Sequence, residues 1–208
     1  MSSKGKKTTE AKVIEKKEIN IPNKGTGAGG ANTTKFGKKF EEETCMKNRL
    51  INNGFVEKKL DKTKSGSYLR KKEGDITIVY LTQSGFKKYC KKKYNIEIWR
   101  NPDEAYIITT PDKCIVKILE KKEQRCEGSV ETKILAGHGF RREYEIAMGD
   151  KFTIEYAFSI NKFLSDKFNS KTPKYSAWRK ILEEDNIKVF HSCEKEYFED
   201  IEKWINKF

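Results

Sequence analysis

Asp103, Glu120 and Lys122 have residue types and a spacing that suit chemistry on a phosphate. Between them lies Thr110-Pro-Asp-Lys113, with proline at the second position as in a type I turn. If this turn closes a hairpin, residues pair when their numbers add to 223, a rule that Asp103 and Glu120 satisfy. The two carboxylates would then lie opposite each other on one face, with Cβ atoms about 4.5–5.5 Å apart. Alternation along the strand adds Lys122 to that face and turns Lys121 away.

Two adjacent carboxylates repel each other and need a cation. Hard oxygen ligands with open positions favour Mg²⁺ over zinc. A lysine beside such a metal could orient or deprotonate an attacking water. Asp103, Glu120 and Lys122 therefore predict metal-assisted hydrolysis of a phosphodiester. His138 and His191 are the only histidines in the sequence, so a catalytic mechanism that needs two histidines has little support.

Pro102-Asp103 followed by Glu120-Lys121-Lys122 resembles the catalytic motif of the PD-(D/E)XK nuclease superfamily. The resemblance implies that Asp103, Glu120 and the main-chain carbonyl of Lys121 bind Mg²⁺. It also implies a further acidic residue on a helix that precedes the sheet. Glu41 matches that position, with Glu42 as the fallback, and would support the metal site or hold a second metal.

The Gly-rich stretch Asn23-Lys-Gly-Thr-Gly-Ala-Gly-Gly-Ala-Asn-Thr33, with the Phe-Glu pair that follows it, is similar to the N-terminal signature of small type II restriction endonucleases. The similarity continues through residues 119–133 and Arg142-Glu-Tyr-Glu145, and covers roughly residues 18–160. It implies a site-specific endonuclease acting on double-stranded DNA, which leaves 5′-phosphate and 3′-hydroxyl ends and pairs functionally with a DNA methyltransferase. Cleavage of a symmetric duplex site favours a homodimer.

Candidate DNA contacts come from the Gly-rich stretch and from the region after the ExK motif. Successive glycines permit close backbone approach to phosphates, and cationic or amide side chains read base edges and phosphates. The candidates are Lys24, Gly27, Gly29, Gly30, Asn32, Gln124, Ser129, Lys133, His138, Arg141 and Arg142. The alternatives are a flexible tether for the Gly-rich stretch, helix capping for Gln124 and Ser129, and solvated surface charges for Lys133, His138, Arg141 and Arg142.

The chain has 208 residues, with 44 Lys+Arg against 31 Asp+Glu and a net charge of +13. Such an excess attracts polyanions, although an anionic membrane surface or plain solubility would also account for it. Five scattered cysteines without a CxxC motif fit reduced thiols and a cytoplasmic location. No apolar run is long enough for a transmembrane helix, and the N-terminus lacks the apolar segment of a secretory signal.

The hydrophobic pattern predicts an α/β (α+β) fold with a mixed central sheet flanked by helices, as in restriction endonucleases. We expect a disordered tail over 1–20, a Gly-rich loop or DNA-contacting arm over 21–34, and a nuclease domain over 35–208. Helices are expected at 35–53, 84–94, 128–148 (interrupted at 137–139), 161–168, 174–185 and 194–207. Strands are expected at 75–81, 96–99, 105–109, 114–122, 151–158 and 187–190, with a loop or weak hairpin over 56–74. Trp99, Trp178 and Trp204 are expected in the core.

Two other functions remain open. A structure-specific repair or recombination nuclease would share the fold and the metal site. A non-catalytic, basic nucleic-acid-binding protein would explain the charge without any use of the carboxylates.

Overall fold

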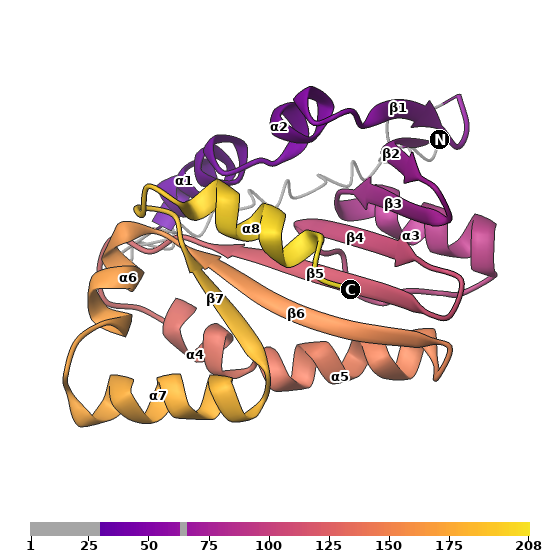
Figure 1. The fold of residues 1–208 in the computed structure, drawn as a ribbon. Coiled ribbons are helices and arrows are strands. Elements are labelled where there is room, and N and C mark those ends of the chain that lie inside the picture. Colours follow the sequence, from indigo (N-terminus) through magenta and orange to yellow (C-terminus); the bar gives the residue numbers. More distant parts are fainter. Residues whose placement is uncertain (1–29, 63–65) are drawn as a thin grey trace, which may run out of the picture.

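A seven-stranded mixed sheet forms the centre of the protein, as the computed structural model shows for residues 30–62 and 66–208 (Figure 1). The predicted tail over 1–20 lies outside these residues, and so does most of the predicted loop or arm over 21–34. The strands lie side by side in chain order, antiparallel from β1 to β5 and parallel from β5 to β7. They are β1 (Val56–Lys59), β2 (Ser67–Glu73), β3 (Ile76–Leu81), β4 (Glu104–Thr109), β5 (Cys114–Lys122), β6 (Phe152–Ile160) and β7 (Ile187–His191). The predicted α/β class with a mixed sheet is confirmed.

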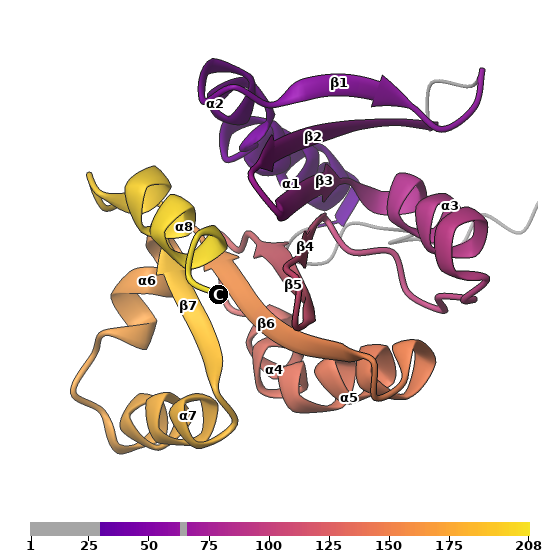
Figure 2. The ribbon, with the colours of Figure 1, turned by 45° about the vertical axis from the view of Figure 1, so that its right-hand side comes forward.

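Helices cover both faces of the sheet (Figures 1 and 2). α2 (Lys47–Asn52) and α8 (Tyr197–Ile205) pack on one face. α3 (Gln83–Tyr94), α4 (Val130–Leu135), α5 (Gly137–Met148), α6 (Lys162–Phe168) and α7 (Pro173–Glu184) lie against the other. α1 (Gly30–Glu43) contacts β5. None of the helices described here is both long and apolar enough to cross a membrane.

β5 is buried on both faces along nearly its whole length, including its charged residues Lys117, Glu120 and Lys121. Val116 and Ile118 belong to the core beneath α3 and α5, whereas Ile115 and Leu119 belong to the core beneath α2 and α8. The period of two along the strand therefore assigns each β5 side chain to one of two separate cores.

Several predicted elements differ from the structure. Residues 96–99 form no regular strand, and the 35–53 helix is divided into α1 and α2 around Thr44, whose hydroxyl donates to the carbonyl of Phe40 at 2.6 Å. The predicted interruption of the 128–148 helical region is present but falls at Ala136, between α4 and α5, so that Gly137 begins α5. The 56–74 segment contains the β1–β2 hairpin. Trp204 is in the core and Trp178 is half-buried, but Trp99 is 56 % exposed, so its predicted place in the core is wrong.

Gly137 lies where α5 packs on the sheet, and a Cβ added there would come within 2.7 Å of the Phe158 ring. Gly139, two residues along the same helix, has open space at that position. We expect Gly137→Ala to lower the free energy of unfolding by about 1–3 kcal/mol, the usual cost of overpacking. Gly139→Ala should raise it by up to about 1 kcal/mol through helix propensity. Urea denaturation of both variants tests the contrast, and equal effects would contradict it.

The buried carboxylate of Glu131 connects α4 to α6 and α7. Its carboxylate accepts hydrogen bonds from Lys174 Nζ at 2.6 Å, Lys167 Nζ at 2.9 Å and the Tyr175 hydroxyl at 3.0 Å. Burial by itself would raise the pKa of Glu131, but these donors outweigh it and lower the pKa to about 2.

A carboxylate with a lowered pKa in the folded state stabilises the protein above its unfolded-state value and loses that contribution as the pH falls. For Glu131 the window runs from about 4.5 down to about 2. We expect Glu131→Gln to cost about 2–3 kcal/mol at pH 7 and much less at pH 2.5. Thermal unfolding of both proteins across that range measures the difference, and a cost independent of pH would contradict the charge assignment.

Candidate active site

Asp103 lies immediately before β4, at the end of the β4–β5 hairpin. The predicted register is confirmed from Thr109 opposite Cys114 to Glu104 opposite Leu119. The ladder stops one pair short of Asp103, whose side-chain Oδ2 accepts a hydrogen bond from the backbone N–H of Lys121 at 2.6 Å. This bond fixes the Asp103 carboxylate against the C-terminal end of β5, beside Glu120.

Lys122 connects the two predicted metal ligands. Its Nζ lies 2.7 Å from Glu120 Oε2 and 3.7 Å from Asp103 Oδ2. All three side chains are largely buried at the C-terminal end of β5. The structure therefore brings Asp103, Glu120 and Lys122 together as a compact cluster, which we call the Asp103 cluster.

Glu120 keeps one buried oxygen, Oε1, without a hydrogen-bond partner. Burial raises the pKa of Glu120, Lys122 opposes that rise, and the negative charge of Asp103 adds to it. An unpaired carboxylate oxygen away from water is costly unless a cation or a donor occupies the site. This oxygen is therefore an available ligand position.

Glu41 on α1 lies close enough to the Asp103 cluster for the charges of Asp103 and Lys122 to act on it. Burial raises the pKa of Glu41 and the charge of Asp103 raises it further, whereas Lys121 and Lys122 lower it. Its Oε2 accepts a hydrogen bond from Gln83 Nε2 at 3.2 Å. Glu42, the fallback for this position, is exposed.

The carboxylates of Asp103 and Glu120 suit Mg²⁺ better than a metal whose ligands must all come from the protein. Within residues 30–62 and 66–208, no three His, Cys, Asp or Glu side chains lie close enough together to hold an ion. Mg²⁺ usually binds through one or two carboxylates and takes its other ligands from water and substrate phosphate. Asp103 and the free Oε1 of Glu120 fit that pattern, with Glu41 near enough to act on Asp103 electrostatically.

The sequence matches no family model and no curated protein. Two solved structures are similar to it. An XisH family protein from Nostoc punctiforme is 14 % identical, with a TM-score of 0.32 over 73 % of this chain and 88 % of that one. MunI restriction endonuclease in complex with cognate DNA is 16 % identical, with a TM-score of 0.30 over 52 % of this chain and 60 % of that one. At these identities and TM-scores neither similarity indicates what this chain does.

Lys121, the middle residue of the Glu-Lys-Lys triplet, points to the opposite face and enters a buried ion pair. Its Nζ lies 2.8 Å from Glu104 Oε1, and both side chains are 2 % exposed. Glu104 also accepts hydrogen bonds from the hydroxyl of Tyr106 at 2.6 Å, the hydroxyl of Tyr80 at 3.2 Å and the backbone N–H of Met46 at 3.1 Å. The buried carboxylate is thus well supplied with donors.

The same ammonium group ties α1 to the sheet. Lys121 Nζ donates to the carbonyl oxygen of Glu41 at 3.1 Å. Since Glu104 and Lys121 are the sequence neighbours of Asp103, Glu120 and Lys122, one buried pair holds the backbone of both active-site strands and of Glu41. The sequence pattern did not identify this role, because a charged residue on a strand is usually assigned to solvent.

Gln83 and Arg100 are further residues at the site that the sequence did not suggest. Gln83 adopts a left-handed conformation with φ of 41°, and its backbone N–H donates to the carbonyl of Pro102 at 2.9 Å. Non-glycine residues in that region are strained and are often found at functional sites. Arg100 lowers the pKa of Glu120 by its positive charge.

The predicted DNA contacts after the ExK motif have varied environments. The Gln124 side chain is buried and donates to the carbonyl of Cys126 at 2.6 Å, while Ser129 and Lys133 are exposed. His138 lies 3.2 Å from Asp185, and both Arg141 and Arg142 contact Glu145. Their DNA-binding roles stay predictions. Lys24, Gly27 and Gly29 lie outside the described residues, and Gly30 and Asn32 fall in the first turn of α1.

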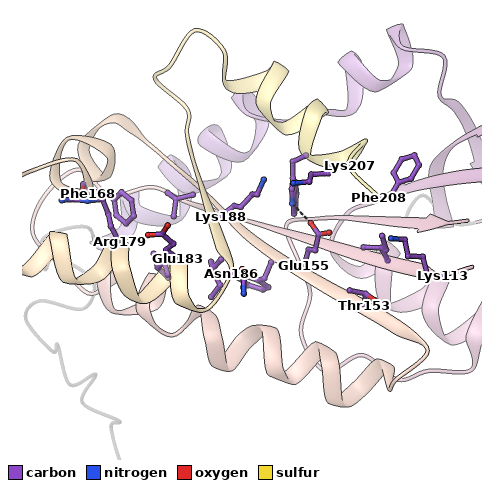
Figure 3. Close-up of a pocket in the computed structure, with 16 residues that line it drawn as sticks. Lys113, Thr153, Glu155, Phe168, Arg179, Glu183, Asn186, Lys188, Lys207 and Phe208 are labelled. Atoms are coloured by element: carbon purple, nitrogen blue, oxygen red, sulfur yellow. Dashed lines mark hydrogen bonds between the residues drawn. The ribbon is translucent and has the colours of Figure 1, made fainter.

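A cavity of about 820 Å³ lies elsewhere, between the β6–β7 pair, α7 and the C-terminal end of α8 (Figure 3). Its lining includes Glu155 and Glu183 beside Arg179, Lys188 and Lys207, and no member of the Asp103 cluster. It therefore does not extend the candidate active site.

Proposed function

We propose that this protein is a Mg²⁺-dependent, site-specific endonuclease of the type II restriction kind, which hydrolyses phosphodiester bonds of double-stranded DNA. The observation that supports it most is the Asp103 cluster: two largely buried carboxylates, one with an unpaired oxygen, joined by a lysine at a strand end. The resemblance to the PD-(D/E)XK motif agrees with this geometry.

Asp103, Glu120 Oε1 and the main-chain carbonyl of Lys121 are the groups that would hold Mg²⁺. When bound, the ion would stabilise negative charge on the phosphate. Lys122 Nζ would donate a hydrogen bond to the attacking water and hold it in line with the scissile bond. Water would add to phosphorus and lose one proton to solvent, the P–O3′ bond would break, and the 3′-oxygen would leave with a proton taken up from solvent. The products carry 5′-phosphate and 3′-hydroxyl ends.

Glu41 would accept a hydrogen bond from a water at the metal or support a second ion. Because the pKa of Glu41 is raised, a cation bound nearby would favour the loss of its proton. A duplex with a symmetric site would be cut by a homodimer, since two-fold protein symmetry then matches that of the DNA. A restriction role further implies a cytoplasmic location and a partner DNA methyltransferase.

Digestion of supercoiled plasmid DNA with Mg²⁺, and with EDTA as the control, tests the proposed function. Discrete fragments whose ends map to one short sequence support a site-specific endonuclease. Cleavage of flaps or junctions alone would replace it with a structure-specific repair nuclease. Duplex binding without cleavage under any divalent metal would support a non-catalytic nucleic-acid-binding protein instead.

Mg²⁺ should also stabilise the protein in the absence of DNA. A ligand at one hundred times its dissociation constant adds about 2.7 kcal/mol to the free energy of unfolding. We expect Mg²⁺ to raise the melting temperature of the wild type, more at pH 8 than at pH 5.5, because Glu120 and Glu41 have raised pKa values and must lose protons to accept a cation. Differential scanning fluorimetry measures the shift, and Glu120→Ala should abolish it. A shift of equal size in that variant would place Mg²⁺ at another site.

A further inference from the structure

The basic excess of the chain is concentrated in one part of the fold. Residues 56–95 contain twelve Lys and Arg against four Asp and Glu, a net charge of +8 within the total of +13. α3 contributes five of these cations and no acidic residue: Lys87, Lys88, Lys91, Lys92 and Lys93. The rest of the chain is therefore much closer to neutrality.

α3 begins beside the Asp103 cluster. The backbone of Gln83 bonds to Pro102, and its side chain bonds to Glu41. The segment 95–103 then returns along α3 and leads into β4 (Figure 2). Trp99 lies four residues before Asp103, so their Cα atoms are at most about 14 Å apart. A duplex with a phosphate at the Asp103 cluster would have to pass close to this segment.

Trp99 is exposed on an anchored backbone. The residue is 56 % exposed, whereas Ile98 and Pro102 are buried. The carbonyl oxygen of Trp99 accepts a hydrogen bond from Lys87 Nζ at 2.8 Å, and that of Arg100 accepts one from the Tyr144 hydroxyl at 3.3 Å. Large aromatic side chains are usually mostly buried. An indole left in solvent on a fixed segment therefore has no role in the core.

Arg100 holds the segment against α5. Its Nε lies 2.6 Å from Glu143, and its guanidinium group lies 4.2 Å from the centre of the Phe140 ring. Its charge also acts on Glu120. The Trp99 segment thus faces the same side of the sheet as the candidate active site.

We propose that Trp99 and the lysines of α3 form the surface that binds the DNA duplex beside the scissile phosphate. The lysines contact backbone phosphates, and the indole packs against a sugar and the edge of a base. The five lysines of α3, with no acidic residue on that helix, are complementary to a polyanion, and the surface is continuous with the Asp103 cluster through Gln83 and Pro102. The choice of DNA as the occupant rests on the proposed function.

The phosphate contacts can be tested by the salt dependence of binding. Duplex binding is measured by fluorescence anisotropy in EDTA at several salt concentrations for Lys87→Gln/Lys91→Gln, where glutamine retains a donor for the Trp99 carbonyl. Each lost phosphate contact reduces the magnitude of the negative slope of log K against log salt by about 1, so we expect the slope of this double variant to be less steep by about 2. Lys171→Gln/Lys195→Gln removes the same charge from exposed positions outside this surface and should keep the slope. Equal slopes in the two double variants would overturn the proposal.

Trp99 itself is tested by affinity and by emission. Trp99→Ala should weaken duplex binding about fivefold or more, near the lower end for one aromatic contact to a nucleotide, and Trp99→Phe should retain most of the affinity. Added duplex should change the tryptophan emission of the wild type and of Trp178→Phe but not of Trp99→Phe. Unchanged affinity in Trp99→Ala, together with an emission change that persists in Trp99→Phe, would overturn the assignment of Trp99.

The outcomes separate this inference from the proposed function. If the wild type binds duplex through these residues but never cleaves it, the nuclease proposal fails and the binding surface stands. If the wild type cleaves DNA while the α3 and Trp99 variants bind like the controls, the surface fails and the nuclease stands. A wild type that binds no duplex overturns both.

Discussion

Glu120→Gln is expected to reduce Mg²⁺-dependent cleavage by at least about 100- to 1000-fold, the range found when one group that stabilises charge in a transition state is removed. Glutamine keeps the volume of the side chain but removes the charge from Oε1, the unpaired oxygen that makes this position available to a cation. Asp103→Asn should have a similar effect, since Asp103 supplies the second carboxylate.

Single-turnover cleavage of supercoiled plasmid at saturating enzyme isolates the chemical step from binding. Duplex affinity in EDTA should be unchanged or higher in both variants, because each removes a negative charge that would face a phosphate. Glu184→Gln removes an exposed carboxylate on α7 and serves as the control. Full activity in Glu120→Gln, or an equal loss in Glu184→Gln, would exclude the Asp103 cluster as the catalytic site.

Lys121→Met is expected to lower the free energy of unfolding by about 3–5 kcal/mol, the usual cost of removing one partner from a buried ion pair. Methionine fills most of the space but leaves the buried Glu104 carboxylate without its cation and the Glu41 carbonyl without its donor. Urea denaturation measures the loss. Hydrogen exchange of residues 35–43 should also accelerate, because Lys121 ties the backbone of α1 to the sheet.

Lys122→Met is the matched control, since it removes the neighbouring lysine. Its side chain is the cation between the largely buried Glu120 and Asp103 carboxylates, but Glu120 has a raised pKa and can take up a proton when that cation is removed, so we expect a smaller loss of stability, of about 1–3 kcal/mol, and a large loss of cleavage. The double variant Lys121→Met/Glu104→Gln should recover part of the stability, because an amide oxygen in the place of Oε1 still accepts from the Tyr80 hydroxyl and the Met46 backbone N–H, and the amide NH2 can donate to the Tyr106 hydroxyl. If Lys121→Met and Lys122→Met destabilise equally, the buried pair does not hold the site.

The candidate site could be predicted from the sequence where its geometry depends on local rules. A four-residue turn determines which residues of β4 and β5 pair, and the period of two then assigns Asp103, Glu120 and Lys122 to one end and one face. The elements from β3 to α8 were also largely predictable, because their apolar patterns are strong. The 96–99 segment was not, since its short apolar run resembles a strand while its hydrogen bonds go to side chains of α3 and α5.

The sequence by itself thus determined the fold class, the hairpin register and the pairing of two carboxylates with a lysine, all of which follow from contacts between residues close in the chain. Only the tertiary structure decided that Lys121 is buried against Glu104, that the carbonyl of Glu41 accepts a hydrogen bond from Lys121, and that Trp99 stays in solvent. These outcomes depend on which helix covers which part of the sheet. No local pattern encodes that packing, because it arises from contacts between residues far apart in the chain.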